Sequence, residues 1–205
     1  FPFIDNPLTG AGFWTARVAA FRVIGRYFGL LIWPGRLAPD YSYNEIPVRA
    51  DAASFLVLAL CIAAAAVAIR SWNRARVLSF AIAFFFVTLA PVSNVFVLIG
   101  SIMAERFLYP PSVGAAAAAV FGVRAVWRRG PAYRIGSYAV AAILLTVFGA
   151  RTYARNRDWL DDQRFWSRAA DATPGNAKAH MNAAVTTPLD KRQDRDRAAA
   201  HADLA

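Results

Sequence analysis

Long apolar stretches place the strongest constraint on how this chain can fold. The stretch from Ala52 to Ile69 reads AASFLVLALCIAAAAVAI and carries no charged side chain. A helix needs about 20 predominantly apolar residues to cross the hydrocarbon core of a bilayer. Four stretches have or approach this length and composition, namely 52–69, 77–98 with a break at Pro91 near one end, 107–123 and 135–150. The sequence therefore predicts an all-α fold, a polytopic membrane helical bundle that is integral to the bilayer.

The distribution of charge predicts how these spans are oriented. The chain has 205 residues, 58% of them hydrophobic, and a formal net charge of +10. Its basic residues are dispersed between apolar runs, which argues against a nucleic-acid partner. The two connections RSWNRAR and RAVWRRGPAYR are short and rich in arginine, as is typical of cytoplasmic loops. Alternation across four spans then predicts that residues 1–51 and the C-terminal tail are extracytoplasmic, in a bacterial periplasm or the lumen of the endoplasmic reticulum.

A fifth apolar segment, 16–33, contains three arginines and is harder to assign. An arginine at mid-bilayer costs roughly 2.5 to 3.5 kcal/mol on the insertion scale. An amphipathic helix that lies on the membrane surface avoids most of this cost. Both an interfacial helix and a true span remain open, and the pair Pro34 and Gly35 ends the helix in either arrangement.

The tail after residue 150 has a polar helical pattern with an apolar face. The turn ATPGN follows, and Asn176 is predicted to cap a short helix from Ala177 to Val185. Helix, proline turn and helix in this order are typical of the start of a tetratricopeptide repeat over 151–187. One repeat cannot bury its own apolar face. Residues 188–205 have no apolar periodicity and are predicted to be a disordered tail.

Polar residues that adjoin prolines gather on the predicted outer side. The candidates for a site are Asp5, Asn6, Asp40, Tyr41, Asn94, Glu105, Arg106 and Tyr109. A proline fixes the backbone direction and ends a helix where a polar turn begins, so these residues are able to converge on one face of the bundle. Simpler explanations stay open for these residues. Asp5 and Asn6 fit an ordinary turn before a proline, and Asn94 fits a residue that hydrogen-bonds backbone groups freed by Pro91. The tyrosines fit an aromatic belt at the membrane interface.

Glu105 and Arg106 stand directly before an apolar run. Adjacent residues on a helix point about 100° apart, so the two side chains do not pair with each other and each needs another partner or water. An arginine fork at a membrane edge suits the phosphate of a headgroup or of a lipid-linked sugar. An interfacial anchor is the alternative interpretation of this pair.

Several kinds of chemistry have no candidate residues. His180 and His201 both lie in the tail, so no cluster has metal-ligand spacing and no catalytic triad is available in the apolar part. Neither a Walker loop nor a GxGxxG motif occurs. Cys61 lies within an apolar run and is most simply a small apolar filler. Spacing alone predicts a polar outer site but no particular reaction.

Four motifs carry a resemblance to a known family. They are IDNPL, PDYSYNEIP, APVSNVFVLIGSIMAERFLYPPSVG and ARNRDWLDDQRFWSRAADATPGNAKAHMN, in this order over nearly all of residues 1–185. Together they resemble the transmembrane and tetratricopeptide repeat-containing O-mannosyltransferases and their bacterial relatives. The family motif ERFLYLPS reads ERFLYPPS here, and the additional Pro110 stiffens the entry to the next helix.

The resemblance implies a glycosyltransferase of the C-type fold. Such an enzyme takes a sugar, here mannose, from a polyprenyl or dolichyl phosphate carrier and transfers it to a protein hydroxyl on the lumenal or periplasmic side. The repeats that follow the membrane domain would contact the protein acceptor. By the same analogy 1–51 is the outer loop that precedes the last four spans, which favours an interfacial helix at 16–33.

The resemblance also implies roles for individual residues. The general base is expected in a first outer loop upstream, so the catalytic residue is unknown, and the chain is expected to be a C-terminal fragment of the membrane domain that is inactive alone. Arg106 would face the phosphate and Glu105 would orient it. Asp40 and Tyr41 would face the carrier or the sugar, and Asn94 would shape the cavity. No metal site is predicted and no cofactor beyond the lipid-linked donor, with metal dependence left undecided.

Two other functions compete with this one. In the first, an inactive membrane anchor presents helical repeats as a scaffold to a partner protein. An acidic pair in the upstream outer loop would support the enzyme, and its absence would support the scaffold. A transporter is disfavoured because the spans contain no internal repeat.

Overall fold

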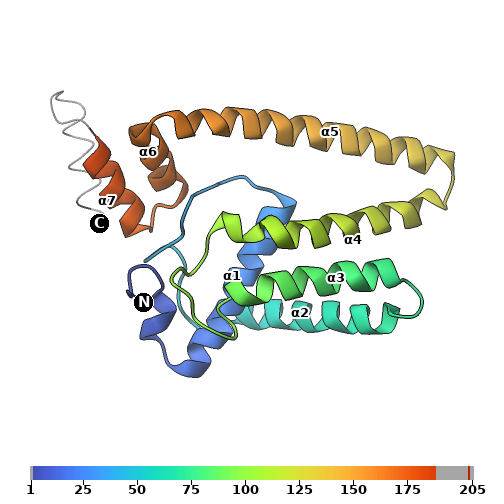
Figure 1. Ribbon diagram of the computed structural model, residues 1–205, viewed down its shortest axis with the longest axis horizontal. Coiled ribbons are helices and arrows are strands. Elements are labelled where there is room, and N and C mark those ends of the chain that lie inside the picture. Colours follow the sequence, from blue (N-terminus) through green and yellow to red (C-terminus); the bar gives the residue numbers. More distant parts are fainter. Residues whose placement is uncertain (1, 188–202, 204–205) are drawn as a thin grey trace.

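The computed structural model describes residues 2–187 and residue 203 (Figure 1). The predicted disordered tail, 188–205, therefore lies outside the described residues except for residue 203. Within the described residues seven α-helices follow one another: α1 Phe13–Ile32, α2 Ala52–Ser71, α3 Arg76–Leu89, α4 Tyr109–Trp127, α5 Pro131–Asn156, α6 Asp162–Ala172 and α7 Ala177–Thr186. Four short 3-10 helices adjoin them: η1 Pro7–Gly10, η2 Ala90–Val92, η3 Glu105–Leu108 and η4 Arg157–Leu160. All regular structure in the described part is helical, which confirms the predicted all-α class.

Helices α2, α3 and α4 lie side by side, and α5 runs back above α4 (Figure 1). The contact between α3 and α4 is very close at Gly114. A Cβ atom there would lie 2.6 Å from the Ala81 carbonyl oxygen and 2.8 Å from the Phe85 amide nitrogen. Ser79 links α3 to α2 by donating a 2.8 Å hydrogen bond to the Ala68 carbonyl. Small residues at these contacts let the backbones approach, as is common between helices in membranes.

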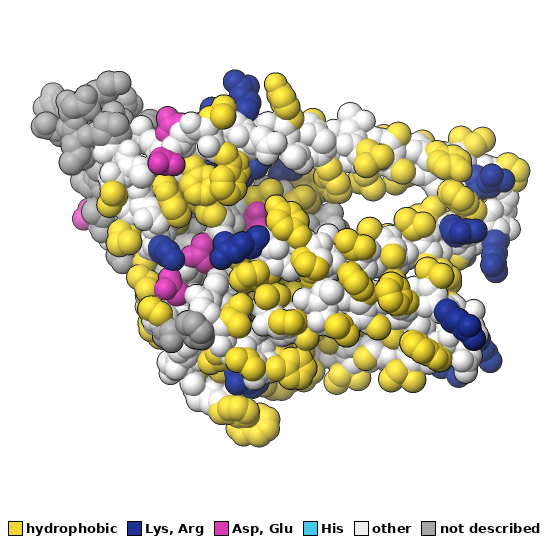
Figure 2. Space-filling model, in the orientation of Figure 1, with side chains coloured by type: hydrophobic (Ala, Val, Ile, Leu, Met, Phe, Trp, Pro, Cys, Tyr) yellow, Lys and Arg dark blue, Asp and Glu magenta, His cyan; other side chains and the backbone are white. Residues whose placement is uncertain are grey.

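Two helices in the described part are long and apolar enough to cross a membrane. They are Ala52–Ser71 and the continuous helical stretch Pro131–Leu160, and only 6% and 0% of their apolar windows are buried. A core helix of a soluble protein with the same composition would be mostly buried, because exposed apolar surface is costly in water. Arg76–Val92 is a shorter apolar helix. The exposed apolar side chains cover the long helices in Figure 2.

Three predicted boundaries differ from the structure. In the stretch 77–98 the α-helix ends at Leu89, close to the predicted break at Pro91, and only the 3-10 helix η2 follows before residue 98. The stretch 107–123 becomes a helix at Tyr109 and continues to Trp127. The last apolar stretch, 135–150, is part of a longer helix that runs from Pro131 to Asn156, so no separate helix begins at residue 151.

Helix α1 lies obliquely across one end of α2 to α4 (Figure 1). Its buried face includes Ala20, Val23 and Tyr27 and belongs to the main hydrophobic cluster, together with Leu89 and Met103. This packing places α1 at the end of the bundle.

The three arginines of α1 each meet a polar group of the surrounding loops. Arg22 pairs with Asp51, Arg26 lies 3.3 Å from a carboxylate oxygen of Glu45, and Arg17 reaches the Asn94 carbonyl. The arginines of the predicted segment 16–33 are therefore each matched by a polar group of a loop.

Candidate functional site

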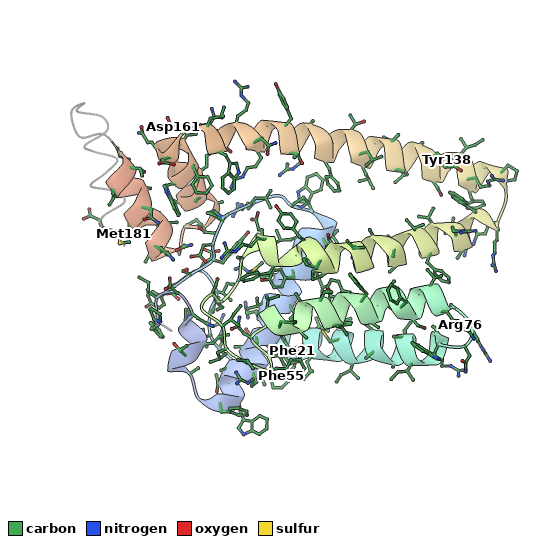
Figure 3. The ribbon with its side chains drawn as sticks, viewed as in Figure 1. Phe21, Phe55, Arg76, Tyr138, Asp161 and Met181 are labelled. Atoms are coloured by element: carbon green, nitrogen blue, oxygen red, sulfur yellow. The ribbon has the colours of Figure 1, made fainter. Side chains whose placement is uncertain are left out.

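The polar residues singled out in the sequence lie at one end of the molecule. The arginine-rich turns that join α2 to α3 and α4 to α5 lie at the other end, where Figure 2 shows a group of basic side chains. Arg76 and Tyr138 mark that end in Figure 3, and Asp161 and Met181 mark the opposite end. The structure therefore separates the arginine loops from the candidate site by the length of the helices.

Asn6 and Asn94 are both fully buried and hydrogen-bonded to each other. The Asn6 amide donates to the Asn94 side-chain oxygen at 2.9 Å, and the Asn94 amide donates to the carbonyls of Ser101 and Ile102 at 3.1 Å each. Asn94 also has a φ of 59°, a left-handed conformation that asparagine tolerates better than most residues. These two side chains fix the backbone of 94–102 and have little capacity left for a ligand.

Asp5 and Asp40 converge on a residue that the sequence analysis did not identify. The Lys178 ammonium group of α7 lies 2.8 Å from an Asp5 oxygen and 3.8 Å from an Asp40 oxygen. Ser42 donates a further hydrogen bond to Asp40. No local pattern predicts this contact, because Lys178 and Asp5 are 173 residues apart in the sequence.

Tyr41, which is buried, and Glu105, which is half-buried, form a second hydrogen-bonded polar pair of the site. The Tyr41 hydroxyl donates a 2.8 Å hydrogen bond to a Glu105 carboxylate oxygen, which also accepts the Ala38 amide. Burial raises the pKa of Glu105, although the hydrogen bonds from Tyr41 and Ala38 and the charge of Arg155 act against that rise. Burial, followed by the Glu105 charge, also raises the pKa of Tyr41. Only 4% of Tyr41 is exposed, so the aromatic-belt interpretation is wrong for this residue.

A cavity of about 210 Å³ adjoins Glu105. Tyr109 lines it from the start of α4, and Arg151, Arg155 and Trp159 line it from α5 and η4. These arginines are not among the site residues predicted from the sequence. Their spacing of four residues, directly after an apolar run, was the available signal, since such a spacing places both on one helix face.

Both arginines fasten the segment 34–37 to α5. Arg151 donates to the carbonyls of Pro34 and Gly35 at 2.8 and 2.9 Å, and Arg155 donates to the Leu37 carbonyl at 2.7 Å. Each guanidinium thus holds the outer loop against the end of a predicted span.

Arg106 and Tyr109 are exposed, unlike Tyr41 and Glu105. Arg106 is exposed, its guanidinium carbon lies 5.1 Å from the centroid of the Phe107 ring, and it makes no ion pair with another described residue. Tyr109 is 76% exposed. Glu105 faces inward while its neighbour Arg106 faces outward, in agreement with the predicted absence of a mutual ion pair.

The end of the chain docks onto the loop that carries Asp40 and Tyr41. Asn176 caps α7 through its side chain, as predicted, and its amide donates to the Asp40 carbonyl at 2.9 Å. The backbone adds two hydrogen bonds, from the Asn44 amide to Gly175 and from the Ala177 amide to Tyr43. The α6–α7 hairpin is therefore held against the candidate site. Within the part of the chain that the structure describes, no group of three or more His, Cys, Asp or Glu side chains is arranged to hold a metal ion.

The fold and the site together define an all-helical protein with two helices able to span a membrane and a polar site at one end. Comparison with known proteins shows to which membrane proteins the chain is similar. The chain is 27% identical over 194 residues to protein O-mannosyl-transferase TMTC4 of Homo sapiens, covering 89% of this chain and 26% of the human protein. It is 27% identical over 191 residues to protein O-mannosyl-transferase Tmtc3 of Drosophila melanogaster, covering 89% of this chain and 21% of the fly protein. Protein O-mannosyl-transferase Tmtc1 of the same organism is 33% identical over 119 residues, which cover 57% of this chain and 14% of that protein.

The chain is thus similar over most of its length to several proteins named protein O-mannosyl-transferases, in agreement with the resemblance that its four motifs carry. The chain spans about one quarter of the length of the curated relatives that it matches over most of its own length. No protein-family model matches the chain, and no solved structure matches it significantly.

Proposed function

We propose that this chain is part of a membrane glycosyltransferase that moves mannose from a polyprenyl or dolichyl phosphate carrier to a protein hydroxyl. The observation that carries the proposal is the arrangement of adjacent residues at the polar end. Glu105 is enclosed and held by Tyr41, and Arg106 is exposed without an ion pair among the described residues. This arrangement occurs in a chain whose relatives are named protein O-mannosyl-transferases.

The separation of charge supports an extracytoplasmic site. Arginine-rich connections remain in the cytoplasm because moving them across the bilayer is unfavourable. The two such connections lie at one end of the molecule, and the candidate site and the α6–α7 hairpin lie at the other (Figures 1 and 2). In the proposed topology the apolar helices cross the membrane several times, and the C-terminal residues are on the periplasmic or lumenal side.

In the proposed reaction the acceptor oxygen forms a bond to the anomeric carbon of mannose. The bond from that carbon to the phosphate oxygen breaks, and the carrier phosphate leaves with the electron pair. The hydroxyl proton passes to an acidic general base that we expect outside this chain. Arg106 stabilises the charge on the leaving phosphate, since a guanidinium forms strong charge-assisted hydrogen bonds to phosphate oxygens.

The other candidate residues have positioning roles in this proposal. Glu105 and Tyr41 orient the segment that carries Arg106, and Asp40 faces the sugar. Tyr109 borders the cavity from its exposed position. Asn6 and Asn94 keep the backbone of the site in place, and Asp5 fixes Lys178 of α7.

The direct test uses membranes that contain the full-length protein, with labelled mannose on a polyprenyl or dolichyl phosphate. We expect Arg106→Gln to raise the KM for the carrier by about tenfold to a hundredfold, the scale of a charge-assisted contact of about 1.5 to 3 kcal/mol. Arg129→Gln removes a positive charge at the opposite end and serves as the matched control. An absence of mannose transfer from either carrier, with the wild-type protein folded in the membrane, would exclude the proposed reaction.

A scaffold function is the second candidate, and the α6–α7 hairpin favours it. Trp166 packs against a buried cluster of small residues, Ala169, Ala170, Ala179 and Ala183. Large exposed residues remain on the hairpin, including Met181 and Val185. A protein that retains a partner through this hairpin but transfers no mannose would be a scaffold.

A further inference from the structure

A second cavity adjoins the one beside Glu105, and five arginines contribute to its lining. Its volume is about 440 Å³, and it lies between segment 35–37, the C-terminal part of α5, and α6. Leu37, Arg151 and Arg155 line both cavities. The arginines of the larger cavity come from three parts of the chain: Arg36 from the loop, Arg151 and Arg155 from α5, and Arg164 and Arg168 from α6. We call this cavity the arginine pocket.

A buried carboxylate organises one wall of the arginine pocket. Asp158 lies 3.3 Å from an Arg155 nitrogen and 2.8 Å from the Arg164 Nε atom. Asp158 therefore holds two guanidinium groups in position without balancing the charge of all five arginines.

The remaining positive charge of the lining is not balanced by acidic side chains within the described part of the chain. Five arginines face two aspartates, Asp158 and Asp171, so the lining carries an excess of three positive charges. Arg36 and Arg168 are exposed and make no ion pair with any described residue. The Nε atom of Arg151 is buried and has no hydrogen-bond partner among these residues. Planar guanidinium forks that converge in this way suit the oxygens of a phosphate group.

The position of the arginine pocket along α5 indicates where the phosphate would come from. Arg151 directly follows the apolar run that ends at residue 150, and its guanidinium carbon lies 5.2 Å from the centroid of the Trp33 ring. Trp33 follows the end of α1 and is 54% exposed. Tryptophan and arginine at the end of a membrane span typically lie at the level of the lipid headgroups.

We propose that the arginine pocket binds a phosphate-class anion, and that this anion is the headgroup of an anionic phospholipid. Such binding fastens segment 35–37 and α6 to the membrane surface beside the candidate site. The proposal does not depend on mannose transfer, because it concerns a different cavity and requires no reaction.

The test uses the whole 205-residue chain in nanodiscs of zwitterionic lipid. Dihexanoyl phosphatidic acid and inorganic phosphate are titrated separately, and bound molecules are counted by native mass spectrometry. We expect the double variant Arg36→Gln, Arg168→Gln to bind phosphatidic acid about tenfold or more weakly. We expect the control Arg157→Gln, Arg129→Gln to change affinity less than about twofold, since neither residue lines the pocket. The thermal unfolding midpoint of both variants verifies that each is folded.

Each outcome bears on the proposal. Binding of phosphatidic acid but not of inorganic phosphate, weakened only in the pocket variant, supports a lipid headgroup as the ligand. Binding of inorganic phosphate with the same dependence supports the anion site and overturns the lipid source. No binding of either probe, or an equal loss in the control variant, overturns the site itself.

Discussion

The Tyr41 hydroxyl donates a 2.8 Å hydrogen bond to the carboxylate of Glu105, which is 64 residues further along the chain. This contact joins the loop that carries Asp40 to the short helix η3 that carries Arg106. It also places the carboxylate of Glu105 beside a cavity that Arg151 and Arg155 of α5 line. The Ala38 amide donates to the same carboxylate, and the Tyr41 amide donates to the Met103 carbonyl. The side-chain hydrogen bond from Tyr41 is thus one of several contacts that join the two halves of the proposed carrier site.

Removing this hydrogen bond should destabilise the protein. In Tyr41→Phe the carboxylate of Glu105 loses a donor in a half-buried position, and we expect a loss of about 1 to 2 kcal/mol in the free energy of unfolding. Thermal unfolding of the detergent-solubilised chain measures the effect. Tyr43→Phe is the matched control, because Tyr43 is 38% exposed and its ring, tilted against that of Phe3 at 5.1 Å between centroids, is retained in the variant. Equal shifts in the two variants would show that the hydrogen bond to Glu105 contributes nothing specific.

The raised pKa of Glu105 predicts a dependence of stability on pH. The folded state binds more protons than the unfolded state between the ordinary value of 4.5 and the raised pKa. The stability contributed by this group is therefore highest below pH 4.5 and decreases as the pH rises through that window. Glu105→Gln removes this titration. We expect the unfolding midpoint of the wild type, relative to that of Glu105→Gln, to fall as the pH is raised, whereas a relative rise would mean that the pKa of Glu105 is lowered.

Two substitutions of Asn94 separate the stability that its side-chain hydrogen bonds contribute from the cost of its left-handed backbone conformation. Both Asn94→Ala and Asn94→Gly lose the hydrogen bonds to Asn6 and to the backbone of 99–102, which should cost about 2 to 4 kcal/mol in total. Alanine must also adopt a φ near 59°, which costs roughly 1 kcal/mol more than glycine does.

We therefore expect the order of stability wild type, Asn94→Gly, Asn94→Ala in thermal unfolding. Asn182→Ala controls for the loss of an amide elsewhere in the chain. A glycine variant that is less stable than the alanine variant would contradict the assigned role of the left-handed backbone.

The contact between α3 and α4 predicts opposite results for two glycines of α4. At Gly114 an added methyl group meets the backbone of Ala81 and Phe85, which cannot move without separating the helices. We expect Gly114→Ala to cost about 1 to 3 kcal/mol, the usual range for overpacking. At Gly122 nothing lies within 4 Å of the added atom, so Gly122→Ala should leave stability unchanged or raise it slightly. Thermal unfolding of both variants checks the prediction, and equal tolerance of both would refute the close approach.

Local signals in the sequence predicted much of the helical content. The uncharged run at 52–69 corresponds to α2, and the asparagine of the ATPGN turn caps α7. The continuation of α5 beyond residue 150 could not be predicted in the same way. Arg151 and Arg155 extend that helix while their side chains bind carbonyl groups that are 116 to 118 residues away in the sequence. Only the folded chain brings those acceptors within reach.

The sequence indicated which polar turns lie at one end of the molecule, but not how their side chains are buried or paired. Prolines beside polar residues indicated outer turns, and those turns do lie at one end of the molecule. The same pattern does not distinguish a buried, satisfied asparagine such as Asn94 from an exposed group such as Arg106, because burial is decided by distant segments. Lys178 was missed for the same reason, since its partners Asp5 and Asp40 come from the other end of the chain.

The most direct test of the account measures which side of the membrane each end of the molecule faces. In a Cys61→Ala background, Tyr109→Cys, Met181→Cys and Arg129→Cys each introduce one thiol for a membrane-impermeant maleimide, added to sealed vesicles of known orientation. The account predicts that positions 109 and 181 are labelled from the same, extracytoplasmic side and that position 129 is labelled only from the other. Labelling of 109 and 181 from different sides would contradict it.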